Sequence, residues 1–324
     1  MATTQTSDLL TDTVAYNKVL RYGLHKRNYF DQVATVQSFP QTHPGSSVKW
    51  NFTTVTGSQD IEQTSTLTET TDVTPVTLAD SMVTVTISEY GAAAKVTAYL
   101  MAVSYLDELL RALTWVGKSA GATLDRVARN TLVAGTNVLY SGTATARNDV
   151  ATSENLTGAN VRQATAFLRK KFADTFTMDD YMAFIHPDVS YDLRGSTATN
   201  NWYDVAQRNE GGGRIWRGAI GKFENNIFIE TPSVGIFTDA GNGAGATGTI
   251  DVYPTLFVGK EALGKAWSEN GQNGPQPRVV ESPVIDNLRR FQGYGWHWIG
   301  GYALVRDVEE LVRYESASTI GTNA

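Results

Sequence analysis

Two segments with alternating apolar and polar residues are separated by a long polar stretch. The alternating apolar positions are Val48, Trp50 and Phe52 in the first segment, and Val83, Val85 and Ile87 in the second. A period of two is typical of a strand with one buried face. The tract between them, residues 63–72, is rich in Thr, Ser and Glu. We predict a protruding two-stranded β-excursion over residues 46–90, which needs another surface to lie against because isolated hairpins are marginally stable.

The pattern changes to a helical period over residues 99–135. Apolar residues recur there every three or four positions, at Leu106, Leu109, Leu110, Leu113, Val116, Leu124, Val127, Ala128 and Leu132. This spacing predicts a long amphipathic helix. Gly117 and Gly121 leave two alternatives open, one kinked helix or two helices in tandem. Gly135 is the expected C-terminal cap.

A second helix is predicted to begin after Thr157, a good N-cap residue. Its apolar stripe is expected to contain Val161, Ala164, Phe167, Leu168 and Phe172. Lys170 and Lys171 lie at its end, where the helix dipole favours cations.

The second half of the chain mixes short strands with loops. The expected elements are strands at 181–185, 227–231 and 249–258, one or two helical turns at 189–195, a short helix or turn at 261–266, an extended segment at 276–285, and a Trp- and Tyr-rich strand within 293–313. Residues 239–248 are expected to form a mobile, Gly-rich hairpin or loop, and residues 211–213 a flexible joint. The order of elements predicts an α+β fold with two lobes rather than regular βαβ alternation.

Composition narrows the class of protein. The 324 residues include 27 basic and 33 acidic side chains, for a formal net charge of −6, and no cysteine. Disulfides, thiolate zinc sites and cysteine nucleophiles are therefore excluded. The balance of charge argues against tight wrapping of DNA and leaves room only for weak contact by one face. The polar N-terminus and the short apolar runs predict neither a signal peptide nor a membrane span.

Motifs of nucleotide-binding proteins occur only in fragments. Gly117-Lys118-Ser119 imitates the end of a phosphate-binding loop, but Ala112 occupies the position of the required first glycine. Gly243, Gly245 and Gly248 have dinucleotide-loop spacing without a preceding strong strand and a following helix. Neither fragment predicts a nucleotide site.

Candidate catalytic and metal-ligating residues are also scattered. The histidines are His25, His43, His186 and His297, and no two have helical ligand spacing. Two pairs of acids are adjacent, Asp179-Asp180 and Glu309-Glu310, but neighbours in a helix or strand point in different directions. We therefore predict no catalytic residue, no cofactor and no metal site, and consider the protein not to be an enzyme.

Three segments of the C-terminal half resemble the major capsid proteins of tailed bacteriophages, in the branch of podophages related to the N-four phage. The segments are 218–232, with a glycine and a strand ending in Glu-Thr, 252–264, with a strand and turn, and 286–307, with a Trp-x-Trp motif followed by glycines and Arg-Asp. Asn287 and His297 depart from the Pro and Lys usual in the last motif.

The resemblance implies the Hong Kong 97 (HK97)-like capsid fold along nearly the whole chain. Its parts would be an N-terminal arm (1–45), an extended β-hairpin called the E-loop (46–90), a peripheral domain with a long spine helix (91–156), an axial domain (157–275), and a return strand to the peripheral domain with the C-terminus (276–324). The preceding order of predicted elements matches this sequence of parts.

The resemblance also implies function and partners. Subunits would form pentamers and hexamers that close an icosahedral shell around double-stranded phage DNA, assembled in the host bacterial cytoplasm and retained in the virion capsid. Expected partners are a separate scaffolding protein, a portal, possible decoration proteins, and packaged DNA through weak non-specific contact; no membrane is expected. Some relatives crosslink Lys to Asn between subunits, and Lys49 is a candidate only by its location.

Three other functions remain open at this stage. A cellular nanocompartment shell (encapsulin-like) would have the same fold and enclose an enzyme. A tail structural protein would form tubes or rings. An enzyme with an unrecognised site would show activity that depends on residues such as His186 or His297.

Overall fold

The computed structural model describes most of the chain. The described residues are 28–36, 47–55, 66–70, 72, 78–104, 107–176, 179–195, 219–241, 249–267, 274–282, 286–288 and 290–320. Most of the expected N-terminal arm, residues 63–65 and 71 of the polar tract, and the 211–213 joint therefore fall outside these ranges. None of the helices in them is long and apolar enough to cross a membrane.

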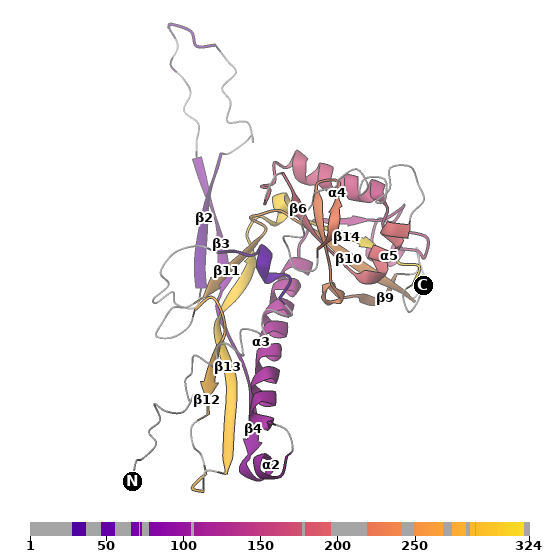
Figure 1. The fold of residues 1–324 in the computed structure, drawn as a ribbon. Coiled ribbons are helices and arrows are strands. Elements are labelled where there is room, and N and C mark those ends of the chain that lie inside the picture. Colours follow the sequence, from indigo (N-terminus) through magenta and orange to yellow (C-terminus); the bar gives the residue numbers. More distant parts are fainter. Residues whose placement is uncertain are drawn as a thin grey trace.

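The first lobe is a sheet built around one long strand, β13 (Phe291–Leu304) (Figure 1). β4 (Ser88–Thr97) pairs antiparallel with one edge of β13, and β11 (Leu263–Trp267) and β12 (Arg278–Glu281) pair with the other. The two-residue strand β1 (Thr35–Val36) adds to β11 in parallel. The aromatic residues predicted in this strand give the sheet one apolar face.

That apolar face packs on α3 (Glu108–Val133), a single helix of 26 residues. Trp296, Trp298 and Tyr302 share a core cluster with its residues Val116, Ala120, Leu124 and Ala128. Gly117 and Gly121 are both buried inside the helix, so their small size lets the helix approach its neighbours. The alternative of two tandem helices broken at these glycines is wrong. The break lies earlier, between α2 (Ala98–Val103) and α3.

The second lobe is a mixed sheet. Its strands, in spatial order, are β5 (Val138–Tyr140), β14 (Leu311–Ser316), β10 (Ile250–Val258), β6 (Tyr181–Ile185), β8 (Asn226–Glu230) and β7 (Ala219–Phe223), with β9 (Phe237–Gly241) also paired to β10. The helical elements of this half are η2 (Arg147–Asp149), α4 (Gly158–Lys170), α5 (Pro187–Gly195), η3 (Pro232–Val234) and α7 (Asp307–Glu310).

Both faces of this second sheet are covered, which explains why β6 and β10 are buried along their whole lengths. Met182, Phe184 and Leu256 belong to the cluster around α3, whereas alternate residues such as Tyr181 and Phe257 belong to the cluster of α4 and α5. Strands buried on both faces show continuous apolar runs instead of alternation.

Residues 28–36 connect the two lobes. Phe30 is fully buried, and its ring centroid lies 4.5 Å from that of Phe184 in the second sheet. The backbone N–H groups of Tyr29 and Phe30 donate to Asp125 of α3 at 2.7 and 2.8 Å. This part of the expected arm therefore belongs to the core.

The predicted strand pair of the β-excursion is confirmed. β2 (Ser47–Val55) and β3 (Leu78–Thr86) pair antiparallel from Ser47↔Thr86 to Val55↔Leu78, and they extend away from the body in Figure 1. Their base lies on the first sheet through a small cluster that includes Val48, Trp50 and Val85. The predicted alternation of buried and exposed residues holds here.

Two local predictions are wrong. Residues 261–266 are mostly the strand β11 rather than a helix or turn, because pairing with β13 supplies the hydrogen bonds that the short apolar run alone does not reveal. Phe172 is not in the apolar stripe of α4; it follows the helix at φ 55° with 74% of its surface exposed. Thr157 does cap α4, accepting from the N–H of Asn160. The structure also forms the strand β7 in a segment whose sequence pattern predicts a loop.

Gly301 should be required for β3 of the β2–β3 hairpin to pack closely against β13. A methyl group there would overlap the carbonyl oxygen of Thr86 in β3. Because backbone cannot move aside as a side chain can, Gly301→Ala should lower the free energy of unfolding by about 1–3 kcal/mol. Chemical denaturation measures this. The matched control is Gly195→Ala, where a methyl group meets nothing within 4 Å; an equal loss in both variants would contradict the assignment.

Candidate functional site

α2 lies at one end of the first lobe (Figure 1). Several large apolar side chains on and near this helix are exposed. Tyr99 is 78% exposed and Trp115 51% exposed. The other exposed members are Leu100, Val103, Leu110, Leu288 and Phe291. Phe291 pairs with Thr97 directly before α2, so these residues form one continuous end of the lobe. We call this group the α2 apolar surface. Exposed apolar surface of this extent is typical of an interaction site.

A groove of about 570 Å³ runs from this surface along α3. Leu100, Leu110 and Trp115 line it together with Arg111 and Lys118. A second, larger hollow of about 910 Å³ lies at the other end of α3, between that helix and η3. Arg126, Arg129 and the buried Asp125 line it. Burial raises the pKa of Asp125 to about 6, although the N–H groups of Phe30 and Tyr29 oppose the rise.

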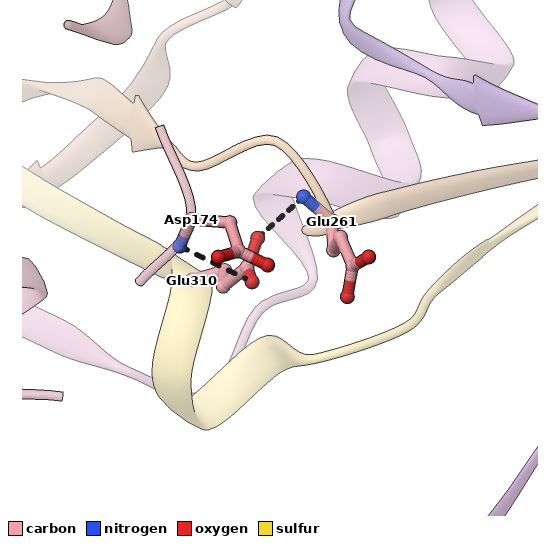
Figure 2. A group of neighbouring side chains, drawn as sticks. All are labelled: Asp174, Glu261 and Glu310. Atoms are coloured by element: carbon pink, nitrogen blue, oxygen red, sulfur yellow. Dashed lines mark hydrogen bonds between the residues drawn. The ribbon is translucent and has the colours of Figure 1, made fainter. Parts of the chain in front are cut away.

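The carboxylates of Asp174, Glu261 and Glu310 meet where the chain crosses between the two lobes (Figure 2). Glu310 is fully buried. One of its oxygens accepts from the N–H of Glu261, and the other lies 3.5 Å from the N–H of Asp174. Glu310 therefore ties together the β10–β11 connection, the segment after α4 and the β13–β14 connection.

The backbone around this cluster is closely packed. The N–H of Gly259 donates to the carbonyl of Glu310 at 2.7 Å, and the N–H of Lys260 donates to the carbonyl of Asp174 at 2.9 Å. A Cβ at Gly259 would lie 3.1 Å from a carboxylate oxygen of Glu310. A larger residue at 259 would therefore press directly on the buried carboxylate.

Burial raises the pKa of Glu310 to about 7, and the nearby carboxylates of Asp174 and Glu261 add to the rise. The N–H groups of Glu261 and Asp174 favour the ionised form and oppose it. The guanidinium of Arg306 lies 3.6 Å from both Glu261 and Glu310. In the described part of the chain this is the one group of acids close enough to share a cation. Its most buried member already has hydrogen-bond donors and a neighbouring arginine, which fits a structural joint better than a metal centre.

The two histidines in the described part of the chain, His186 and His297, lie in different lobes. His186 is buried against Tyr253, and its Nδ1 accepts from the N–H of Asp188 at 3.3 Å. Burial lowers the pKa of His186, although the nearby carboxylates of Asp188 and Glu230 oppose this shift. His297 Nε2 lies 2.7 Å from Glu89 on the adjacent strand. His25 and His43 lie outside the described residues.

The adjacent acids diverge, as expected. Asp180 is buried beside Lys222 at 2.6 Å, while Asp179 adopts φ 63° and is exposed. Glu309 pairs with Arg306 at 2.9 Å, whereas Glu310 points into the cluster.

The motif fragments and the crosslink candidate named from the sequence can now be placed in the structure. Gly117-Lys118-Ser119 lies inside α3, and Ser119 accepts from the indole N–H of Trp296 at 3.3 Å. No phosphate-binding loop is formed by these residues. Lys49 is exposed on β2 opposite Thr84. Gly243, Gly245 and Gly248 are outside the described ranges.

A buried ion-pair group was missed from the sequence. Glu315 of β14 is fully buried and accepts two hydrogen bonds from Arg147, at 2.8 and 2.7 Å, and its carboxylate also lies 2.8 Å from Arg313. The guanidinium of Arg147 stacks 3.5 Å from the centre of the Phe237 ring. The alternation of Arg313 and Glu315 with apolar residues in β14 was the only sequence signal for it.

The pH dependence of stability tests the role of Glu310. A carboxyl whose pKa is raised in the folded chain holds its proton more tightly there than when unfolded. The free energy of unfolding should therefore fall as pH rises from about 4.5 to about 7, by at most about 3 kcal/mol. Glu310→Gln should remove this component, so the free energy of unfolding of the variant should change less between pH 5 and pH 8 than that of the wild type.

Chemical denaturation of unassembled subunits at pH 5 and pH 8 measures both. Glu281→Gln, an exposed change of the same kind, controls for the loss of one negative charge. Parallel pH profiles for the wild type and Glu310→Gln would contradict the assignment.

Comparison with known proteins accounts for this arrangement. The model of the phage capsid protein family matches residues 116–317. No curated protein sequence matches the chain significantly.

Solved capsid structures are similar over nearly the whole chain. The capsid of Ralstonia phage GP4 has a TM-score of 0.72 at 15% identity, covering 100% of this chain and 96% of that chain. The Cyanophage Pam1 capsid has 0.67 at 13% identity, covering 99% and 97%. The capsid of Helicobacter pylori bacteriophage KHP30 has 0.64 at 12% identity, covering 89% and 88%.

The family match covers more than half of the chain, and the expected α+β, HK97-like fold is confirmed. The chain belongs to the phage capsid protein family and is a structural protein of the capsid shell.

Proposed function

We propose that the chain is the subunit of an icosahedral shell, built from its pentamers and hexamers, that encloses double-stranded phage DNA. The observation that carries the proposal is the end-to-end similarity to capsid subunits, which extends beyond the segment matched by the family model. We propose a purely structural role without enzymatic activity.

The parts of the subunit take the roles expected from the resemblance. In this proposal, residues 46–90 are the E-loop, 91–156 the peripheral domain with α3 as spine helix, and 157–275 the axial domain. Residues 276–324 return to the peripheral domain, and 1–45 contain the arm. The projecting β2–β3 pair and the exposed α2 apolar surface support contacts between subunits, since both lack partners sufficient to cover them within the described chain.

Further partners belong to the same proposal. A separate scaffolding protein, a portal and a decoration protein would act with the shell, and assembly would take place in the bacterial cytoplasm. Each subunit contact is individually modest, and closure of many contacts stabilises the particle.

Electron microscopy of the expressed protein tests the proposal. Closed polyhedral particles are expected, alone or with the scaffolding protein. Tubes or rings would instead identify a tail component. Particles from infected cells that contain an enzyme rather than DNA would identify a nanocompartment.

Deletion of residues 59–77 should separate folding from assembly. It leaves Thr56-Gly57-Ser58 between the paired residues Val55 and Leu78, a three-residue connection with the glycine that short hairpins favour. The subunit should remain soluble and keep its unfolding midpoint, because the base of the hairpin is retained, but closed shells should not form. Unfolding of the deleted subunit would show that the segment belongs to the core, and normal shells would show that it makes no required contact.

A further inference from the structure

Four basic residues lie on one face of α3. They are Arg111, Lys118, Arg126 and Arg129. At about 100° per residue, all four fall within an arc of about 80°. We call this set the α3 basic stripe. Helical rise of about 1.5 Å per residue makes it about 27 Å long.

The stripe faces away from the sheet that covers α3. Leu113, Val116 and Leu124 are buried on the opposite side of the helix. Between the basic residues, the same outer face carries Trp115 and Ala122, which are both exposed. The stripe is therefore reached from solvent through the groove between α3 and β4 at one end and the hollow between α3 and η3 at the other.

Its positive charge is only partly balanced by the subunit. Glu108 pairs with Arg111 at 2.9 Å. Asp125 lies close by in sequence, but it is buried and accepts backbone N–H groups. Lys118 and Arg126 have no ion pair within the described ranges, and the exposed side chains of both reach solvent.

Arg129 shows the same incomplete pairing. Its Nη1 donates to the carbonyl of Val234 at 3.4 Å, while its buried Nε has no partner in the described structure. Burial lowers the pKa of Arg129, and the like charge of Arg126 adds to this effect. An anion beside the two arginines would favour the charged form of Arg129 and offset its repulsion from Arg126.

The two hollows along α3 provide room for such an anion. Arg111 and Lys118 line the groove at one end, and Arg126 and Arg129 line the larger hollow at the other. The larger hollow adds polar groups that can donate hydrogen bonds, including Asn130 and Ser233. Such groups suit phosphate oxygens.

We propose that the α3 basic stripe contacts the phosphate backbone of duplex DNA inside the shell. Duplex DNA carries about one negative charge per 1.7 Å of axis, so a stripe of about 27 Å can neutralise several phosphates. Contact of this kind is independent of sequence and is broken easily by salt, as storage and release of a genome require. The inference rests on the proposed function and names the surface that serves it.

The side chains along the α3 basic stripe favour contact with nucleic acid over contact with an acidic protein segment. A docked amphipathic helix needs an apolar groove with several anchors. The Arg126–Arg129 hollow presents two guanidinium groups together with the side chains of Asn130 and Ser233. Trp115 is the one large apolar residue between the basic positions of the stripe.

A pair of matched double variants tests the proposal. Lys118→Glu with Arg126→Glu alters the stripe. Arg162→Glu with Lys170→Glu is the control, because it changes one Lys and one Arg, both exposed, eight residues apart on α4. Both double variants change the net charge by the same amount. The probe is a short fluorescent DNA duplex of mixed sequence, titrated with unassembled subunits across a salt series.

Wild type and control should bind the duplex alike, and the stripe variant should bind at least about tenfold more weakly at low salt. Its log–log salt dependence should be shallower by about 2, since each phosphate contact contributes about 0.9. Lys118→Gln with Arg126→Gln serves if charge reversal prevents folding, which circular dichroism detects, and should give a smaller loss in the same direction.

Three results would overturn the proposal. They are absence of duplex binding by the wild type, an equal loss in both double variants, and unchanged binding by the stripe variant. Unchanged binding together with failed shell assembly would assign the stripe to an acidic protein contact instead. Because the titration uses unassembled subunits, its result is independent of whether electron microscopy supports the proposed shell.

Discussion

The shared burial of α3 is the constraint on which the rest of the subunit depends. One side of the helix packs on the aromatic face of β13, and its C-terminal half also shares a cluster with Met182, Phe184 and Leu256 of the second sheet. Small residues such as Ala120 and Gly121 let all these surfaces approach. A single rigid helix thus sets the relative position of both lobes. A shell subunit needs this, because an error in the angle between its lobes is repeated at every copy.

The sequence predicted the elements whose burial is one-sided. Alternation in β2 and β3 and helical spacing in α3 and α4 identified these four elements correctly. The strands β6, β8 and β10, whose partners are distant in sequence, were also predicted close to their observed bounds, whereas two local assignments failed. β11 reads as a turn until β13 lies beside it, and Phe172 continues the helical stripe although the chain leaves the helix with a positive φ at that residue. Local pattern does not contain the identity of the neighbouring strand.

The candidate sites were less predictable for the same reason. Glu310 and Asp174 are far apart in sequence, and they meet only because the lobe connections cross there. Exposed Leu100 and Val103 are indistinguishable in sequence from core residues of a short amphipathic helix. The adjacent acids Asp179 and Asp180 diverge for a reason that the sequence does not show, because Asp179 lies in a turn with φ 63° and not in a regular helix or strand.

Net charge does not show where the basic and acidic side chains lie in the folded chain. A formal charge of −6 argues against a protein that wraps DNA tightly. The same chain nevertheless gathers four cations along the outer face of α3, while Glu310, Glu315 and Asp125 bury acids in the interior. A buried carboxylate that is hydrogen-bonded or paired has little influence on a ligand outside, whereas an exposed lysine or arginine acts across about 10 Å of solution. The surface potential is therefore more positive along this face than the composition implies, and such a face can hold a polyanion weakly without binding it tightly.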